Sequence, residues 1–223
     1  MHSLTKKTTL SIIKKYIPNP RTIVEAGAFN GHDTQQLAAA FPDTRIHAFE
    51  PVPEIFDLLE KNTRHLPNVH CYPYALSSHT GNAPFFISET PSSPGKPFQA
   101  GSLLMPKERL LWSKIRYPKK IMVPTITLDD WAIEHKIASI ELLWLDAQGH
   151  ELDIVKASPT MLPGVTCIYT EVNFIHAYEQ QPLFKEMVEW FLKKSFILAG
   201  KDFTDEKQWF FGNALFTRKK YYS

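Results

Sequence analysis

The chain has 223 residues, of which 43% are hydrophobic and 22% charged, and its formal net charge is +2. This composition is ordinary for one folded domain, and no dense block of Lys and Arg indicates a nucleic-acid partner. No apolar run approaches the ~20 residues of a bilayer-spanning helix. The N-terminal segment also lacks the apolar core of a signal peptide. We therefore expect one domain over residues 1–223, without membrane contact.

The two cysteines, Cys71 and Cys167, each lie in an apolar, strand-like run. No C-x-x-C pair indicates a zinc site. We interpret them as buried thiols in a reducing compartment, which predicts a cytoplasmic protein.

Helical and extended patterns alternate along most of the chain. Residues 1–20 form a helical lead-in, in which Leu10, Ile13 and Ile17 mark a short amphipathic helix that Pro18 ends. The predicted strands cover 22–26, 45–50, 69–74, 141–146, 166–172, 195–199 and 209–217. The predicted helices cover 32–41, 53–64, a segment from 127, 150–156 and 182–194. Such alternation favours a mainly parallel sheet with helices on both faces.

One segment, 77–124, breaks this pattern because it is rich in Pro, Ser and Gly. Residues 91–97 cannot form a helix or a central strand, and extended pieces are expected at 83–88, 101–105 and 122–126. We predict a loop insertion. Two readings stay open: a lid over a ligand, with Trp112, Arg116 and Tyr117 as substrate contacts, or a solvent-exposed excursion.

Ligands of such sheets bind at the carboxyl ends of the strands. The first strand ends at a turn containing Gly27, and the second ends at Glu50, about 20 residues further on, where a carboxylate can bind the hydroxyls of a ribose. Phe29 stands where a dinucleotide site needs a second glycine, which speaks against a pyrophosphate. Glu25 would repel a pyrophosphate but suits the cationic methionine end of S-adenosylmethionine.

Several blocks, in order and over nearly the whole chain, resemble the FkbM-type family of S-adenosylmethionine-dependent methyltransferases. They are Val-Glu-Ala-Gly-Ala at 24–28, His-Ala-Phe-Glu-Pro at 47–51, Tyr-Ala-Leu-Ser at 74–77, 123–130, the specific Leu-Trp-Leu-Asp-Ala-Gln-Gly-His-Glu-Leu at 143–152, 169–173 and Phe-Gly-Asn at 211–213. The chain departs from the family pattern at Phe29, Asn30 and Trp144, the last where many members carry lysine. The resemblance implies an α/β, Rossmann-like class I methyltransferase fold, with seven mostly parallel strands and an antiparallel last strand, and methyl transfer, typically to oxygen.

The candidate cofactor site follows the strand ends and the matching motifs. Glu25 is expected on the methionine ammonium, Glu50 on the ribose, and Thr34 on the cofactor carboxylate, although a first-turn threonine also bonds its own helix. Glycines shape the turn, and Ala28 permits close approach. The predicted cofactor-binding residues are Glu25, Gly27, Ala28, Gly31, Thr34, Glu50, Pro51, Ala75, Leu76 and Asp146.

Three residues are candidates for the chemistry of transfer. Asp146 directly follows an apolar strand and could orient the acceptor hydroxyl or take its proton, although it could also cap the Asp-Ala-Gln-Gly turn. Glu171 ends the next strand and could share this work, and His150 titrates near neutral pH. Asp146, Glu171 and Asn173 could also hold a divalent cation, but nothing in their spacing demands one, and no metal is predicted.

We therefore expect an S-adenosylmethionine-dependent O-methyltransferase that acts on a hydroxyl of a sugar, a glycan or another small metabolite. Two alternatives remain at this point: an NAD-dependent oxidoreductase, and a non-catalytic module that keeps the methyltransferase fold and binds a partner.

Overall fold

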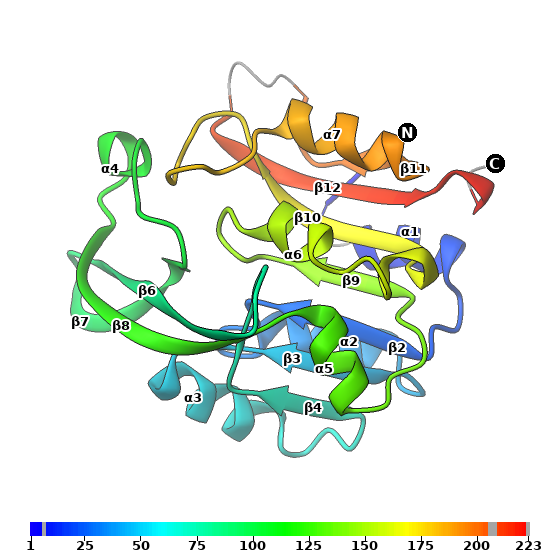
Figure 1. Ribbon diagram of the computed structural model, residues 1–223, viewed down its shortest axis with the longest axis horizontal. Coiled ribbons are helices and arrows are strands. Elements are labelled where there is room, and N and C mark those ends of the chain that lie inside the picture. The colour runs from blue at the N-terminus through cyan, green and yellow to red at the C-terminus, as the bar shows by residue number, and fades with distance from the viewer. Residues whose placement is uncertain (6–7, 205–208, 222–223) are drawn as a thin grey trace.

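The computed structural model describes residues 1–5, 8–204 and 209–221. It is an α/β protein with a large central sheet and a smaller sheet beside it (Figure 1). The helices are α1 (Thr9–Tyr16), α2 (His32–Ala40), α3 (Pro53–Thr63), α4 (Arg109–Trp112), α5 (Leu128–Glu134), α6 (Glu151–Lys156) and α7 (Phe184–Lys193), with 3₁₀ turns at Leu162–Gly164 and Lys219–Tyr221.

The described part of the large sheet has eight strands in the order β1-β11-β12-β10-β9-β2-β3-β4. Neighbouring strands are parallel except that β12 runs antiparallel to both β10 and β11. The strands are β1 (His2–Ser3), β2 (Thr22–Ala26), β3 (Arg45–Phe49), β4 (Val69–Tyr72), β9 (Leu142–Leu145), β10 (Cys167–Asn173), β11 (Phe196–Lys201) and β12 (Phe211–Arg218). The Rossmann-like class I fold, with its antiparallel last strand, is thereby confirmed.

Alternating side chains of the strands explain why helices cover both faces. In β2, Ile23 packs with the apolar stripes of α1 and α2, whereas Val24 packs in the cluster that contains α5, α6 and α7. Both strand residues are fully buried. Parallel strands buried on both faces read as continuous apolar runs, which is why the sequence locates these strands well.

The strand count differs from the seven expected because the lead-in over residues 1–20 is not only helical. α1 forms as predicted, but His2 and Ser3 form a two-residue strand that pairs in parallel with β11 at Gly200 and Lys201. A strand of two residues carries no periodic pattern, so sequence reasoning could not find it.

The largest correction concerns residues 77–124, which are not a loop. They form most of a second sheet in the order β5-β8-β6-β7, shown at the left of Figure 1. Its strands are β5 (Ala75–Leu76), β6 (Gly81–Thr90), β7 (Ser93–Ser102) and β8 (Arg116–Ile126).

The proline-rich stretch fits this sheet because of its position. β7 contains Pro94 and Pro97 and lies at the sheet edge, where proline need not donate to a second neighbour. The expectation that residues 91–97 avoid a central strand is confirmed. Buried Ala83, Phe85 and Ile87 alternate along β6 and turn one face of this sheet toward α3.

Two further findings concern the expectations about membrane spans and cysteines. Among the described helices, none combines the length and apolar character needed to cross a bilayer. Cys71 and Cys167 are free thiols, half-buried and buried respectively.

Candidate functional site

The turn after β2 brings two strand ends into close contact. Gly27 has a φ of 80°, and a Cβ built on it would lie 1.9 Å from the carbonyl oxygen of Asp146, at the end of β9. The Asp146 amide donates to the carbonyl oxygen of Ala26 over 3.0 Å. Only glycine satisfies both the backbone angle and the spacing here, so this glycine fixes the junction between β2 and β9.

Glu50 lies at the end of β3 and holds the same turn. Its carboxylate accepts hydrogen bonds from the amides of Phe29 (3.1 Å) and Val52 (2.9 Å). The residue is only 6% exposed, and burial raises the pKa of its carboxyl from 4.5 to about 7 against the lowering effect of those two bonds. Each carboxylate oxygen has a second lone pair, so Glu50 can still accept from a ligand hydroxyl.

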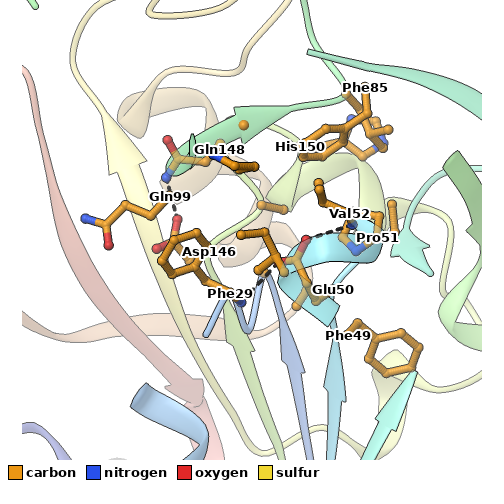
Figure 2. A pocket seen from close by; sticks show the side chains of 18 of the residues that line it. Phe29, Phe49, Glu50, Pro51, Val52, Phe85, Gln99, Asp146, Gln148 and His150 are labelled. Atoms are coloured by element: carbon orange, nitrogen blue, oxygen red, sulfur yellow. Dashed lines mark hydrogen bonds between the residues drawn. The ribbon is translucent and has the colours of Figure 1, made fainter. Parts of the chain in front are cut away.

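A narrow cavity, here called the Glu50 pocket, opens beside this carboxylate (Figure 2). Its floor comes from the ends of β2, β3 and β9, and one wall comes from β6 and β7 of the small sheet. Most of its lining is apolar. The lining includes Gly27, Phe29, Phe49, Glu50, Pro51, Val52, Ile55, Ala75, Leu76, Phe85, Ile87, Gln99, Gly101, Leu103, Asp146, Gln148 and His150.

A second, wider cavity, here called the Arg109 cavity, lies on the other side of Asp146. It takes side chains from the N-terminal segment, α1, α2, α4, β9, β10 and β12, and most of its polar groups are acids or amides. Its lining includes Thr5, Thr9, His32, Asp33, Gln36, Gln99, Arg109, Trp144, Asp146, Gln148, Tyr169, Glu171, Asp202, Phe211 and Asn213. The two cavities share Gln99, Asp146 and Gln148, so this trio marks their junction.

Asp146 faces both cavities, which is why its side chain is accessible although protein surrounds it on its other sides. The Gln148 amide nitrogen donates to its Oδ1 over 2.6 Å. Loss of water around Asp146 raises the pKa of its carboxyl to about 6, with the Gln148 bond opposing this rise. The result is a carboxylate that is still mostly ionised at neutral pH but more basic than usual.

Gln148 is a residue whose role sequence reasoning missed. Its φ of 49° lies in the left-handed region, as does the φ of 49° at Phe29, and both residues line the Glu50 pocket. Tyr178 donates to the Gln148 side-chain oxygen over 2.9 Å, which leaves the amide nitrogen aimed at Asp146. Backbone held in this region by its surroundings is a feature of functional turns, so the Asp-Ala-Gln-Gly block was a usable signal.

Glu171 and Asn173 lie at the end of β10, and Glu171 lines the Arg109 cavity. The Asn173 amide donates to Glu171 over 3.2 Å, and the Gln148 amide approaches it at 3.4 Å. Burial, reinforced by the charge of Asp146, raises the pKa of the Glu171 carboxyl well above 4.5. Burial thus favours the protonated form of Glu171, in which the carboxyl can donate as well as accept a hydrogen bond.

Two predicted cofactor residues lie below the cavity floor instead of lining either cavity. Glu25 is 1% exposed and accepts a 2.6 Å hydrogen bond from the hydroxyl of Thr34, which is fully buried. Burial raises the pKa of the Glu25 carboxyl to about 8. Thr34 in α2 thus donates its hydroxyl hydrogen bond to Glu25 in the neighbouring strand β2. Contact of either residue with a cofactor stays a prediction.

Ala28 and Gly31 shape the turn from outside the cavities. Ala28 is buried against Leu59 of α3. Gly31 precedes α2 with a φ of 82°, and a Cβ there would meet the side chains of Leu59 and Thr63 at 2.9 and 3.0 Å. Their part in cofactor binding stays a prediction. In the structure, both residues pack the turn against α3.

His150 lies in the Glu50 pocket but not in the lining of the Arg109 cavity. Its Nε2 is 3.2 Å from the hydroxyl of Ser77, and its Nδ1 is 3.4 Å from the carboxylate of Asp153. Burial lowers its pKa. In Figure 2 it lies near Phe85 and Val52, on the opposite side of the pocket from Asp146.

Glu151, the first residue of α6, holds the turn after β9. It accepts hydrogen bonds from the amides of Ala147 (2.9 Å) and Gly149 (3.1 Å) while only 2% exposed. Because it satisfies these orphan donors, Glu151 fixes the backbone that carries Asp146 and Gln148.

The remaining candidate contacts lie outside the two cavity linings. The ring of Trp112 stacks on Phe210 with centroids 4.6 Å apart, and the Tyr117 hydroxyl is 3.1 Å from that of Tyr178. Arg116 is exposed at the start of β8. The described residues contain no group of three or more His, Cys, Asp or Glu arranged to hold a metal ion.

Comparison with known proteins agrees with this geometry. The family described as the Methyltransferase FkbM domain matches residues 25–198. The chain is 30% identical over 173 residues to the 2-O-methyltransferase NoeI of Sinorhizobium fredii, covering 77% of this chain and 70% of that protein. It is 27% identical over 129 residues to the hexuronic acid methyltransferase AglP of Haloferax volcanii, covering 57% of this chain but only 47% of that protein.

Solved structures share the fold at low sequence identity. Magnesium protoporphyrin IX methyltransferase of Synechocystis, solved with bound S-adenosylmethionine, superposes with a TM-score of 0.53 at 8% identity, over 95% of this chain and 77% of that one. Fibrillarin of Aeropyrum pernix, solved with natively bound S-adenosylmethionine, gives a TM-score of 0.53 at 12% identity, over 95% and 74%. The fold, the strand-end site and the family match over most of the chain together show that this protein belongs to the FkbM methyltransferase family.

Proposed function

We propose that the protein transfers a methyl group from S-adenosylmethionine to a hydroxyl oxygen of a sugar, a glycan or another small metabolite. Membership of the FkbM family supports methyl transfer. The names of the two relatives, a 2-O-methyltransferase and a hexuronic acid methyltransferase, support an oxygen acceptor on a carbohydrate.

The observation that carries the proposal is the buried carboxylate of Glu50 at the mouth of a largely apolar pocket. A ribose presents two adjacent hydroxyls that donate to such a carboxylate. Ala75 and Leu76 line the same pocket and offer an apolar surface for the adenine ring. The residues present therefore fit an adenosine.

The Gly27 turn and the acids near it suit the methionine end of the cofactor. The pocket floor at Gly27 is bare backbone, and Asp146 adds a carboxylate at the junction of the two cavities. Carboxylates attract a cationic ammonium and sulfonium. When bound, S-adenosylmethionine supplies an electrophilic methyl group on its sulfonium.

Asp146 is the residue that we assign to the acceptor hydroxyl. Methyl transfer to an alcohol requires the oxygen to be held in line and its proton to be removed. Asp146 lies at the junction, is oriented by Gln148 over 2.6 Å, and has a pKa raised by desolvation to about 6. It can therefore accept the hydroxyl hydrogen bond and then the proton, an ability lost as pH falls below this pKa.

Glu171 and His150 take different parts in this proposal. Glu171 lines the Arg109 cavity, its pKa is raised by burial, and it orients the acceptor by hydrogen bonding. His150 lies only in the Glu50 pocket, so we assign it to the adenosine side and not to proton removal.

The two alternative functions make different predictions. An NAD-dependent oxidoreductase needs room for a pyrophosphate at the turn, but Phe29 lines the pocket there and is partly buried against the α3 side. The family match also favours methyl transfer over hydride transfer. A non-catalytic binding module would keep the cofactor pocket but would not depend on Asp146 for any reaction.

The proposal also covers the compartment of the protein and the class of its partner. Two free thiols suit a reducing, cytoplasmic compartment. The small net charge of +2 supports a small-molecule or glycan acceptor and no nucleic-acid partner.

The experiment is to titrate the protein with S-adenosylhomocysteine and with NAD by calorimetry, and then to follow methyl transfer from S-adenosylmethionine to a panel of glycosides. We expect binding of the first ligand only, and transfer that Asp146→Asn abolishes even at cofactor concentrations that saturate the variant. Tight NAD binding would contradict the proposal. Transfer that is unchanged in Asp146→Asn would contradict the role of this residue.

A further inference from the structure

Arg109 lines the wider of the two cavities, and the proposed reaction does not use its side chain. It begins α4, a short helix that follows the small-sheet strand β7, and it is only 7% exposed. The amides of Lys107 and Arg109 donate to the carbonyl of Ala177 over 2.8 and 3.3 Å. These bonds fix the backbone of α4 against the loop after β10, so the arginine is held in place and is not a free surface side chain.

Two of the three guanidinium nitrogens of Arg109, Nε and Nη1, are buried without a hydrogen-bond partner in the described structure. The rings of Trp112 and Tyr178 lie 5.3 and 5.7 Å from its central carbon and cover it without accepting those bonds. The charge of Arg109 also acts on the carboxyls of Asp146 and Glu171, but without an ion pair to either. A buried donor left without a hydrogen bond is costly, which points to a hydrogen-bond acceptor that enters the cavity.

The four acids that line the Arg109 cavity each accept a hydrogen bond from an amide instead. Asp33 accepts from the side chain of Gln36 over 3.2 Å. Asp146 accepts from Gln148, and Glu171 accepts from Asn173. Asp202 accepts from both the backbone and side-chain amides of Asn213, over 2.7 and 2.8 Å. No ion pair of 4 Å or less joins Arg109 to a carboxylate in the part of the chain that the structure describes. Arg109 is therefore a positively charged donor in this cavity whose guanidinium has no carboxylate hydrogen-bonded to it in the described structure.

We propose that the Arg109 guanidinium binds a carboxylate of the methyl acceptor, so that the protein selects an acidic sugar over the matching neutral sugar. This inference rests on the proposed methyl transfer and names its substrate class. Guanidinium and carboxylate form paired, charge-assisted hydrogen bonds, which suits selection by a single functional group.

The cofactor also carries a carboxylate, on its methionine end, but the position of Arg109 favours the acceptor. Arg109 lines the wide cavity and not the Glu50 pocket. Between the two cavities stand Asp146 and Gln148, to which we assign the acceptor hydroxyl. Arg109 is thus on the acceptor side of the reacting atoms.

The test compares two probes that differ by one carboxylate, methyl β-glucuronide and methyl β-glucoside. Each is titrated calorimetrically into protein saturated with S-adenosylhomocysteine, and methyl transfer to each is measured with S-adenosylmethionine. We expect the glucuronide to bind at least tenfold more tightly. Arg109→Gln should remove this preference while leaving the affinity for S-adenosylhomocysteine within twofold. Arg109→Lys, which keeps the charge, should retain part of it.

The control is Arg64→Gln, the same change at an exposed position next to the C-terminal end of α3. It should leave the preference intact. Equal binding of the two probes by the unaltered protein, or no binding of either, would overturn the inference without requiring any variant to fold. A tenfold loss of S-adenosylhomocysteine affinity in Arg109→Gln would overturn it by assigning the guanidinium to the cofactor. Failure of the unaltered protein to bind S-adenosylhomocysteine would instead overturn the proposed function.

Discussion

The two cavities that meet at Asp146 are built in different ways. The Glu50 pocket is narrow and mostly apolar, and strand ends and tight turns form its floor. The Arg109 cavity is wide and polar, and it collects side chains from separate segments, including the N-terminal segment and α4. We propose that recognition in the first depends on backbone shape and on the carboxylates of Glu50 and Asp146, whereas recognition in the second depends on side-chain hydrogen bonding. On the proposed function, cofactor recognition therefore follows from the fold, while acceptor recognition follows from individual residues.

The largest expected effect comes from Gly27→Ala, which disrupts the close contact between the ends of β2 and β9. The added Cβ would meet the Asp146 carbonyl oxygen at 1.9 Å, in a backbone conformation with a φ of 80° that alanine rarely adopts. We expect destabilisation of about 3 kcal/mol or more, a fall in melting temperature on the order of 10 °C, and loss of cofactor binding. Thermal denaturation and calorimetry measure these effects.

A matched control is Gly164→Ala, in a 3₁₀ turn where an added Cβ meets nothing within 4 Å. Its melting temperature should stay within about 2 °C of the unaltered protein. If Gly27→Ala were as harmless as this control, the close approach of β2 to β9 would not be needed for the site.

Glu50→Ala tests the Glu50 pocket alone. Removing the carboxylate takes away a charge-assisted hydrogen-bond acceptor, so the affinity for S-adenosylhomocysteine should fall at least about tenfold, or ~1.4 kcal/mol. The same titration on Glu54→Ala, an exposed position in α3, should show no change. Equal affinities for the two variants would remove Glu50 from the cofactor site.

The pH dependence of cofactor binding sharpens the same assignment. Burial raises the pKa of the Glu50 carboxyl to about 7, and we propose that its ionised form binds the ribose hydroxyls. Affinity for S-adenosylhomocysteine should therefore be full above this pKa and fall about tenfold between pH 8 and pH 6. Glu25 and Asp146 titrate nearby, at about 8 and about 6, so the comparison is with Glu50→Gln. If the affinity of Glu50→Gln for S-adenosylhomocysteine changed with pH as steeply as that of the unaltered protein, the role of Glu50 would be contradicted.

The smallest expected effect is that of Tyr178→Phe on the acceptor side. The Tyr178 hydroxyl is 2.9 Å from both the Gln148 side-chain oxygen and the Ala100 carbonyl, and the residue is fully buried. Its loss should cost about 1–2 kcal/mol of stability. Because it orients Gln148 and hence Asp146, kcat should fall a few-fold while cofactor affinity is unchanged. Tyr221→Phe, at an exposed position, should alter neither quantity. A loss of cofactor affinity would show that the two cavities do not act separately.

The sequence predicted the parts of the molecule that depend on local pattern. Buried parallel strands read as apolar runs, so β2, β3 and β9 and their polar end residues were located correctly. Glu50, Gly27 and Asp146 could be placed at one sheet edge because parallel strands end on the same side.

The parts that sequence reasoning missed depend on contacts between distant segments. The strand β1 has two residues and is defined only by its pairing with β11. The proline-rich segment forms strands because β7 lies at an edge and β6 turns an apolar face toward α3. Arg109 is unremarkable in sequence, and its burial among Trp112 and Tyr178 comes from packing across separate parts of the fold.

The most direct test of the account is a crystal structure of the protein with S-adenosylhomocysteine. We expect the ribose hydroxyls to contact the carboxylate of Glu50, with the adenine beside Ala75 and Leu76 and the sulfur directed toward Asp146. A ligand bound elsewhere, or a ribose that makes no contact with Glu50, would contradict the assignment of the two cavities.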